Sequence, residues 1–104
     1  MFARVATYEG SPDKLDEALR VTREKVIPGA EKLEGFEGAY LLFDRKTGKS
    51  MSISLWRSEK DVHASEEAGS RLRSQGSSAG GSKELGIHRY EVAIAPAHIP
   101  AAKR

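Results

Sequence analysis

The apolar and polar positions of the first thirty residues predict a strand followed by a helix. β-branched and aromatic residues at positions 2–9, followed by the turn-forming EGSPD, indicate a strand that ends in a loop. Ser11 suits a helix N-cap and Pro12 the first helical position. Apolar side chains then recur on one helical face, at Leu15, Leu19, Thr22 and Val26. Because Pro28 disfavours helical geometry in the residue before it, we expect this helix to end at residues 27–29.

The middle of the chain predicts a β-hairpin and a second helix. Two strand-like segments, GFEGAYLLFD and SMSISLW, flank RKTGK, a turn in which Gly48 is expected to take a positive φ. Ser58 and Asp61 have the spacing of a capping box, which marks a helix start. The stripe of this helix that is predicted to be buried consists of unusually small residues: Val62, Ser65, Gly69 and Leu72.

The last third of the chain predicts a connection, a strand and a tail. Glycine and serine dominate QGSSAGGSKELG, residues 75–86, which favours a flexible loop. The segment follows a helix instead of a strand, so it does not match a phosphate-binding loop. Residues 87–95, IHRYEVAIA, are predicted to form the final strand. We therefore expect one domain over residues 1–96 and a C-terminal tail over residues 97–104.

The resulting order, β-α-β-β-α-β, is that of the ferredoxin-like fold, in the α+β class. It places both helices on one face of a four-stranded antiparallel sheet and leaves the other face bare. The strands nevertheless carry apolar groups on both sides, as the segment after Gly38 illustrates with Ala39, Tyr40, Leu41, Leu42 and Phe43. A bare face of this kind is a large apolar patch. We therefore predict a homodimer joined through the sheet faces.

Composition narrows the classes of function. The 104 residues include no cysteine, which excludes disulfides and thiolate sites and fits a cytoplasmic location. No signal peptide and no membrane span of about 18 apolar residues is predicted. The 17 basic and 15 acidic residues interleave, so we expect no nucleic-acid partner. The three histidines have no compact ligand spacing, and we expect neither a metal site nor another cofactor.

Two segments and their order along the chain carry a resemblance to a known family. IPGAEKLEGFEGAYLLFD, the strand end SLWRSEKD and the acidic second helix resemble the antibiotic biosynthesis monooxygenases, which are dimeric α/β barrels. The resemblance covers roughly residues 2–95. It implies a ferredoxin-like dimer. The superfamily includes cofactor-free monooxygenases that act on electron-rich polycyclic aromatics, haem-degrading monooxygenases, and proteins with no established reaction.

Trp56 is the residue for which the resemblance implies a functional role. In the polycyclic-aromatic branch a tryptophan at this position contacts a substrate held between sheet and helices. The haem-degrading branch combines an asparagine on the first strand with a tryptophan ending the third strand and a histidine on the second helix. Trp56 and His63 match the last two, but the chain contains no asparagine at all.

Strand alternation puts Ser50, Ser52, Ser54 and Trp56 on one face and Met51, Ile53 and Leu55 on the other. If the serine face meets the helices, its small side chains leave a cavity beside Trp56 that suits a flat organic ligand. If the other face does, the serines enter the dimer interface. The alternation leaves both open, and the resemblance favours the first. The candidate substrate-binding residues are Trp56, Ser52, Ser54, Arg4, Tyr8, His63 and His88.

Arg4, which shares a strand face with Tyr8, is expected either to point a cation into this cavity or to pair with Glu91. Three functions compete. The first is a cofactor-independent monooxygenase-like enzyme acting on a small aromatic or polycyclic substrate. The second is a non-catalytic protein of the same fold that binds a small ligand or acts in stress. The third is haem binding or degradation.

Overall fold

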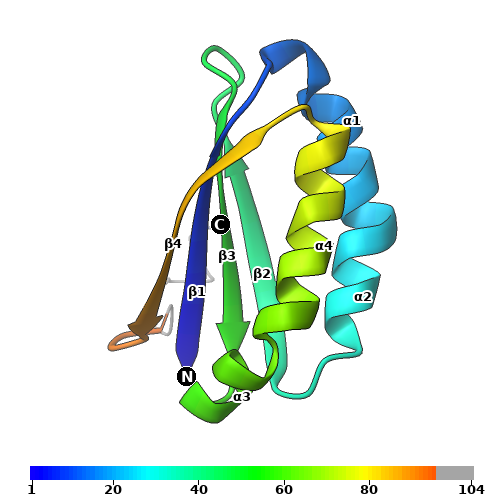
Figure 1. Ribbon diagram of the computed structural model, residues 1–104. Helices are drawn as coiled ribbons and strands as arrows, with labels where there is room; N and C mark the ends of the chain where they lie inside the picture. Colours follow the sequence, from blue (N-terminus) through cyan, green and yellow to red (C-terminus); the bar gives the residue numbers. More distant parts are fainter. Residues whose placement is uncertain (96–104) are drawn as a thin grey trace, which may run out of the picture.

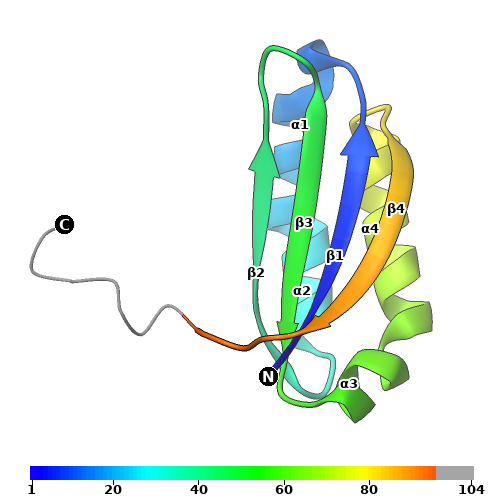
Figure 2. The same ribbon diagram turned by 90° about the vertical axis from the view of Figure 1, so that its left-hand side faces the viewer.

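The computed structural model describes residues 1–95 and places the helices on one side of an antiparallel sheet (Figure 1). The strands are β1 (Phe2–Glu9), β2 (Phe36–Phe43), β3 (Lys49–Trp56) and β4 (Lys83–Glu91). Their spatial order is β2-β3-β1-β4, with both hairpin strands on one side of β1 and the last strand on the other (Figure 2). The predicted ferredoxin-like α+β fold is confirmed. The predicted tail, residues 97–104, lies outside the described residues.

The first helical region is longer than the sequence predicts. It runs through a 3-10 turn (Pro12–Lys14), α1 (Leu15–Val21), a π-helical segment (Thr22–Val26) and α2 (Ile27–Glu31). The expected end at residues 27–29 is therefore wrong. Ile27 keeps helical geometry, and its N–H donates to the Thr22 carbonyl across the wider π turn, which accommodates the ring of Pro28. The Ser11 side chain, expected to cap the helix, makes no capping hydrogen bond.

The hairpin and the start of the second helical region agree with the sequence. Gly48 has φ of 83° in the β2–β3 turn. The Ser58 hydroxyl accepts the N–H of Asp61 at 3.2 Å and donates to its carboxylate at 3.0 Å, so Ser58 is the helix N-cap, with the Asp61 carboxylate bound to its hydroxyl. Two helices follow, α3 (Glu59–Ala64) and α4 (Glu66–Ala79).

The glycine-rich segment predicted to be a flexible connection over residues 75–86 is mostly regular structure. The helix α4 continues to Ala79 and β4 begins at Lys83, so β4 also starts and ends earlier than predicted. The glycines allow α4 to lie close to the first helical region. A Cβ at Gly80 would lie 2.8 Å from the Ala18 side chain, and one at Gly76 would lie 3.3 Å from the Thr22 hydroxyl. The glycines here permit close packing of two helices, and they do not mark a loop.

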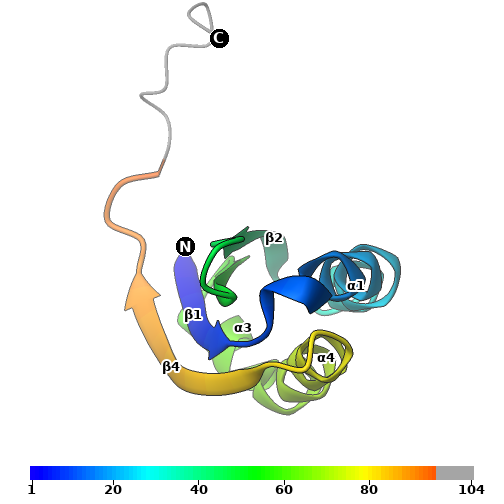
Figure 3. The same ribbon diagram turned by 90° about the horizontal axis from the view of Figure 1, so that it is seen from above.

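The two faces of the sheet differ in what covers them. Figure 3 shows the helices on one side of the sheet, and no helix or strand of residues 1–95 lies on the other. The strand registers put the serine side of β3 on the helix face, which we call the inner face. It carries Arg4, Ala6, Tyr8, Ala39, Leu41, Phe43, Ser50, Ser52, Ser54 and Trp56. The favoured orientation of β3 is thus the one observed. The opposite, outer face carries Val5, Thr7, Leu42, Met51, Ile53, Leu55, His88 and Tyr90. Within residues 1–95, no helix has the length and apolar character needed to cross a membrane.

Candidate functional site

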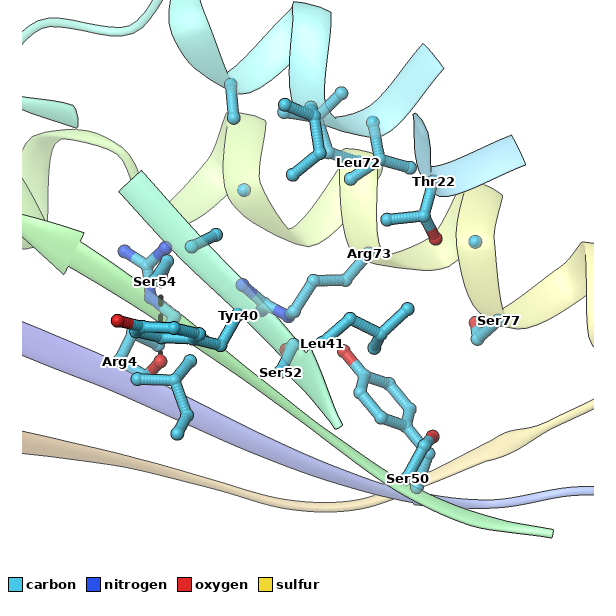
Figure 4. A pocket seen from close by; sticks show the side chains of 18 of the residues that line it. Arg4, Thr22, Tyr40, Leu41, Ser50, Ser52, Ser54, Leu72, Arg73 and Ser77 are labelled. Atoms are coloured by element: carbon cyan, nitrogen blue, oxygen red, sulfur yellow. Dashed lines mark hydrogen bonds between the residues drawn. The ribbon is translucent and has the colours of Figure 1, made fainter. Parts of the chain in front are cut away.

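A cavity of about 130 Å³ lies between the inner face and the helices (Figure 4). Its floor is made by the small side chains of Ser50, Ser52 and Ser54 on β3, which cannot reach the helices. Apolar side chains of the helical regions form the roof, among them Leu15, Ala18, Val26, Ile27 and Leu72. The cavity exists because small residues on the strand face small residues on α4, which leaves less than normal interior packing between them.

Trp56 lines the cavity and is packed on several sides. Its side chain is 2% exposed. The indole Nε1–H donates to the Ser54 hydroxyl at 2.9 Å, and the ring meets that of Phe36 edge-to-face at 5.4 Å. Arg4 lies over the indole, with its Cζ 5.2 Å from the ring centroid. Trp56 therefore both packs and lines the cavity, and its polar N–H is already used within the protein.

Arg4 is a buried cation beside Trp56 in the cavity lining, also 2% exposed. Its Nη2 donates to the Val62 carbonyl at 2.7 Å, to the Ser65 hydroxyl at 2.8 Å and to the Glu66 carboxylate at 3.1 Å. Burial, as the largest cause, lowers the pKa of Arg4 below its usual value, and Glu66 opposes this shift. Arg4 thus points into the cavity region, as one alternative expected, and its carboxylate partner is Glu66 instead of Glu91.

Glu66 connects Arg4 to the rim of the molecule. It receives hydrogen bonds from Arg4 on one side and from two nitrogens of Arg89 on the other. The Arg89 hydrogen bond is the main reason that the pKa of Glu66 falls from 4.5 to about 2. One carboxylate is therefore shared by two guanidinium groups. No sequence pattern identified Glu66, because it looked like part of a solvated acidic helix face.

Two further polar side chains enter the cavity, Tyr8 from β1 and Arg73 from α4. Burial raises the pKa of Tyr8, so its phenol stays neutral near pH 7. Arg73 is 14% exposed in its side chain and donates through Nε to Glu84 at 3.2 Å. Sequence reasoning missed Arg73. Its position four residues after Gly69 puts it beside the predicted buried stripe, which was the available signal.

The two candidate histidines do not join the other candidates. His63 is exposed on α3 and lines a separate shallow depression with Phe2 and Tyr90. His88 is exposed on the outer face of β4, beside Tyr90 at 6.3 Å between ring centroids. Neither belongs to the cavity lining. The structure thus brings together Arg4, Tyr8, Ser52, Ser54 and Trp56 of the predicted set. Across residues 1–95, no group of three or more histidines, aspartates or glutamates is placed to hold a metal ion.

Comparisons with known proteins agree with this architecture. A monooxygenase from the gene ActVA-Orf6 of Streptomyces coelicolor, solved in complex with nanaomycin D, superposes with a TM-score of 0.63 over 92% of each chain at 19% identity. SnoaB, a cofactor-independent oxygenase from Streptomyces nogalater, gives 0.63 over 93% of this chain and 97% of its own at 12% identity. The fold is that of the antibiotic biosynthesis monooxygenases.

This monooxygenase-type fold is shared at low sequence identity, and no protein-family model matches the chain. Among curated proteins, the uncharacterised protein Rv2557 of Mycobacterium tuberculosis is 29% identical over 73 residues. The match covers 70% of this chain, and the chain spans about a third of the relative, with 33% of its length aligned.

Proposed function

We propose that this protein is a cofactor-independent monooxygenase-like enzyme that takes a small aromatic substrate into the cavity between sheet and helices. The observation that carries the proposal is the cavity itself. It is mainly apolar, the indole of Trp56 lines it, and cationic and phenolic groups enter it from Arg4, Arg73 and Tyr8. A flat ring with one or two oxygen substituents matches this arrangement. Oxygenases of the same fold support the reaction class.

The volume favours a single-ring substrate over a polycyclic one. An apolar cavity of roughly 150 Å³ is known to take benzene, and the cavity here measures about 130 Å³. We therefore place small phenols first among the substrates, and tricyclic compounds second.

The chemistry that fits is oxidation of a phenol by O₂ with electrons from the substrate. The phenol first releases its proton to water, because the cavity lining has no histidine or carboxylate, and the cationic groups of Arg4 and Arg73 stabilise the oxyanion. Oxygen then reacts at the ring carbon opposite the oxyanion. One oxygen atom remains there as a carbonyl, and the other leaves as water with the ring hydrogen and the phenolic hydrogen. A phenol and O₂ thus give a quinone and water, with no external reductant.

The working form is proposed to be a homodimer through the outer faces of two sheets, as the sequence predicted. The outer face offers large apolar side chains that no part of residues 1–95 covers, with Leu42 at 50% exposed and Tyr90 at 55%. A second copy can bury them face to face, and the cavities then lie on the two far sides of the joined sheets. The dimer supports the fold and leaves each cavity within one subunit.

A non-catalytic ligand-binding protein is the second candidate, and one observation favours it. The cavity lining contains no histidine or carboxylate to accept a proton, because His63 and His88 lie elsewhere. Catalysis therefore requires a substrate acidic enough to ionise against Arg4 and Arg73. The same placement of His63 argues against the haem alternative, because the exposed imidazole cannot ligate an iron in the cavity.

Two measurements on the same protein test the proposal. Trp56 fluorescence is titrated with phenol, 1,5-dihydroxynaphthalene and anthrone, and oxygen uptake is then followed with each compound, with and without catalase to detect peroxide. We expect saturable quenching by the smaller compounds and uptake of one O₂ per quinone formed, without peroxide. The Ser52→Leu variant, with its cavity filled, is the negative control. Binding without uptake above the control would favour the non-catalytic candidate, and absence of quenching by all three would overturn both.

A further inference from the structure

The polar groups around Trp56 are unevenly balanced in charge. Three guanidinium groups lie on this side of the sheet, those of Arg4, Arg73 and Arg89. Two carboxylates pair with them: Glu66 with Arg4 and Arg89, and Glu84 with Arg73. Glu66 is therefore shared by two cations, of which Arg89 is 40% exposed and lies outside the cavity lining, whereas Arg4 is buried within it. A buried cation whose counterion is shared is stabilised by a further anion.

Arg4 also has unused hydrogen-bonding capacity. All three of its hydrogen bonds to protein acceptors leave from Nη2. Its Nε is buried and has no hydrogen-bond partner within residues 1–95. Buried donors are nearly always paired in proteins, by protein, water or ligand. Arg4 belongs to the cavity lining, and its Nη1, from which none of these three hydrogen bonds leaves, can donate to a molecule there.

Arg73 brings a second guanidinium to the same place, and Gly69 makes room for both. In Figure 4 the Arg73 side chain extends from α4 across the cavity toward the end that holds Arg4. A Cβ at Gly69 would lie 2.7 Å from Nη1 of Arg4 and 3.2 Å from Nη1 of Arg73. Both cations thus approach one point on α4 that carries no side chain. Like charges this close repel each other, and an anion bound between them offsets the repulsion.

We propose that the cavity selects aromatic monoanions, with the anionic oxygen held between Arg4 and Arg73 and the ring set against the apolar wall. The anion can be a carboxylate that the ligand brings or a phenolate formed on binding. The shared chemistry is one oxyanion on one flat ring. This inference rests on the proposed small-molecule site, and it holds whether or not the bound ring reacts with oxygen.

A matched pair of probes tests the charge requirement directly. Benzoate and benzamide have the same ring and nearly the same shape, and only benzoate is charged at pH 7.5. Binding is measured by calorimetry and by Trp56 fluorescence. A charged hydrogen bond replaced by a neutral one predicts that benzoate binds about tenfold or more tightly than benzamide. Binding of benzamide equal to or tighter than that of benzoate overturns the inference and leaves the proposed aromatic site standing. Failure of both probes to bind overturns the two together.

Variants on α4 assign the effect to Arg73. Arg73→Gln should remove most of the preference for benzoate and leave benzamide affinity nearly unchanged. Arg71→Gln is the matched control, since Arg71 is exposed on the same helix and pairs with Glu67. Arg4→Lys keeps the charge and removes both Nε and Nη1, and should weaken benzoate alone. Equal loss of both probes in Arg73→Gln would mean a structural role and would contradict the inference.

The two sources of the anion are separated with 1-naphthol. If the cavity creates phenolates, bound 1-naphthol shows the naphtholate absorbance at a pH below its own pKa, and Arg73→Gln reverses this. If the spectrum stays that of the neutral phenol while benzoate still binds preferentially, the site is one for carboxylates. Either result supports the inference, and neither depends on oxygen uptake.

Discussion

The two faces of the sheet differ in how tightly their side chains are covered. The inner face, which the helices cover, mixes apolar side chains such as Leu41 and Trp56 with serines and a buried arginine, whereas the outer face, which they leave bare, carries large apolar side chains. In an antiparallel sheet with one uncovered face, that face is ordinarily polar. The inner face is thus loosely packed and forms a cavity, and the outer face leaves apolar surface exposed. The difference indicates that stability and ligand binding are divided between the faces, and the following changes test that division.

The largest effect is expected from a charge on the outer face. Leu42→Asp changes a side chain that is half exposed in the single chain, so the fold of the subunit should survive. A carboxylate buried without a partner in a dimer interface should weaken association at least about 100-fold. Sedimentation would then show monomers where the wild type is dimeric. Ser70→Asp, at an exposed position of α4, is the control. A monomeric wild type would contradict the proposed role of this face.

Filling the inner face should affect binding and spare stability. Ser52→Leu places an apolar side chain in the cavity, which should raise or maintain the thermal midpoint and lower aromatic affinity by about tenfold or more. Calorimetry with the ligand and thermal unfolding without it measure the two effects. Ser70→Leu makes the same change on the surface and should leave affinity unchanged. A strongly destabilised Ser52→Leu would mean that the cavity closes in solution.

Trp56 contributes both to the stability of the fold and to the lining of the cavity. Trp56→Phe removes the Ser54 hydrogen bond and part of the cation–π contact, and should cost about 1–3 kcal/mol of unfolding free energy. Ser54→Ala leaves the indole N–H unpaired and should cost about 1–3 kcal/mol as well. Denaturant unfolding checks both. If Ser54→Ala leaves the unfolding free energy unchanged, another acceptor, such as water in the cavity, replaces the hydroxyl.

The smallest effect is the pH dependence from Glu66. Its pKa is about 2 in the folded protein and 4.5 as the reference value. Because the folded pKa is the lower one, the stabilisation is complete above pH 4.5 and is lost as the pH falls toward 2. Unfolding midpoints between pH 6 and pH 2.5 should therefore decline. The Glu66→Gln variant should have a lower unfolding midpoint at pH 6, and its midpoint should decline less between pH 6 and pH 2.5. An equal slope in both proteins would assign the acid sensitivity to other carboxylates.

The fold could be predicted because its signals are local. The spacing of Leu15, Leu19 and Val26, the Gly48 turn and the Ser58 cap each act within a few residues. Errors arose where distant packing overrides local preference. The segment around Gly76 and Gly80 has the composition of a loop, yet α4 continues to Ala79. Its glycines are explained by the close approach of Ala18 and Thr22, which leaves no room for larger side chains. Ile27 similarly stays helical before a proline.

The candidate site was only partly predictable for the same reason. Alternation alone placed Ser52, Ser54 and Trp56 on one face of a strand. It could not show that Arg4 binds Glu66, a residue 62 positions away, or that Arg73 reaches the same cavity. His63 and His88 were chosen for their chemistry, and the structure places both outside the cavity because their backbone positions face outward.

The sequence by itself thus determined the order of strands and helices, the two-sided apolar character of the sheet and the presence of small residues where two elements meet. These follow from periodicity and side-chain size, which any stretch of chain carries within itself. Only the tertiary structure decided which face meets the helices, that the small residues leave a cavity, and that Arg4 and Arg73 converge there beside Gly69. Those outcomes depend on contacts between segments that are far apart in the chain. The packing of these segments decides how much space is left between them and which charged groups meet.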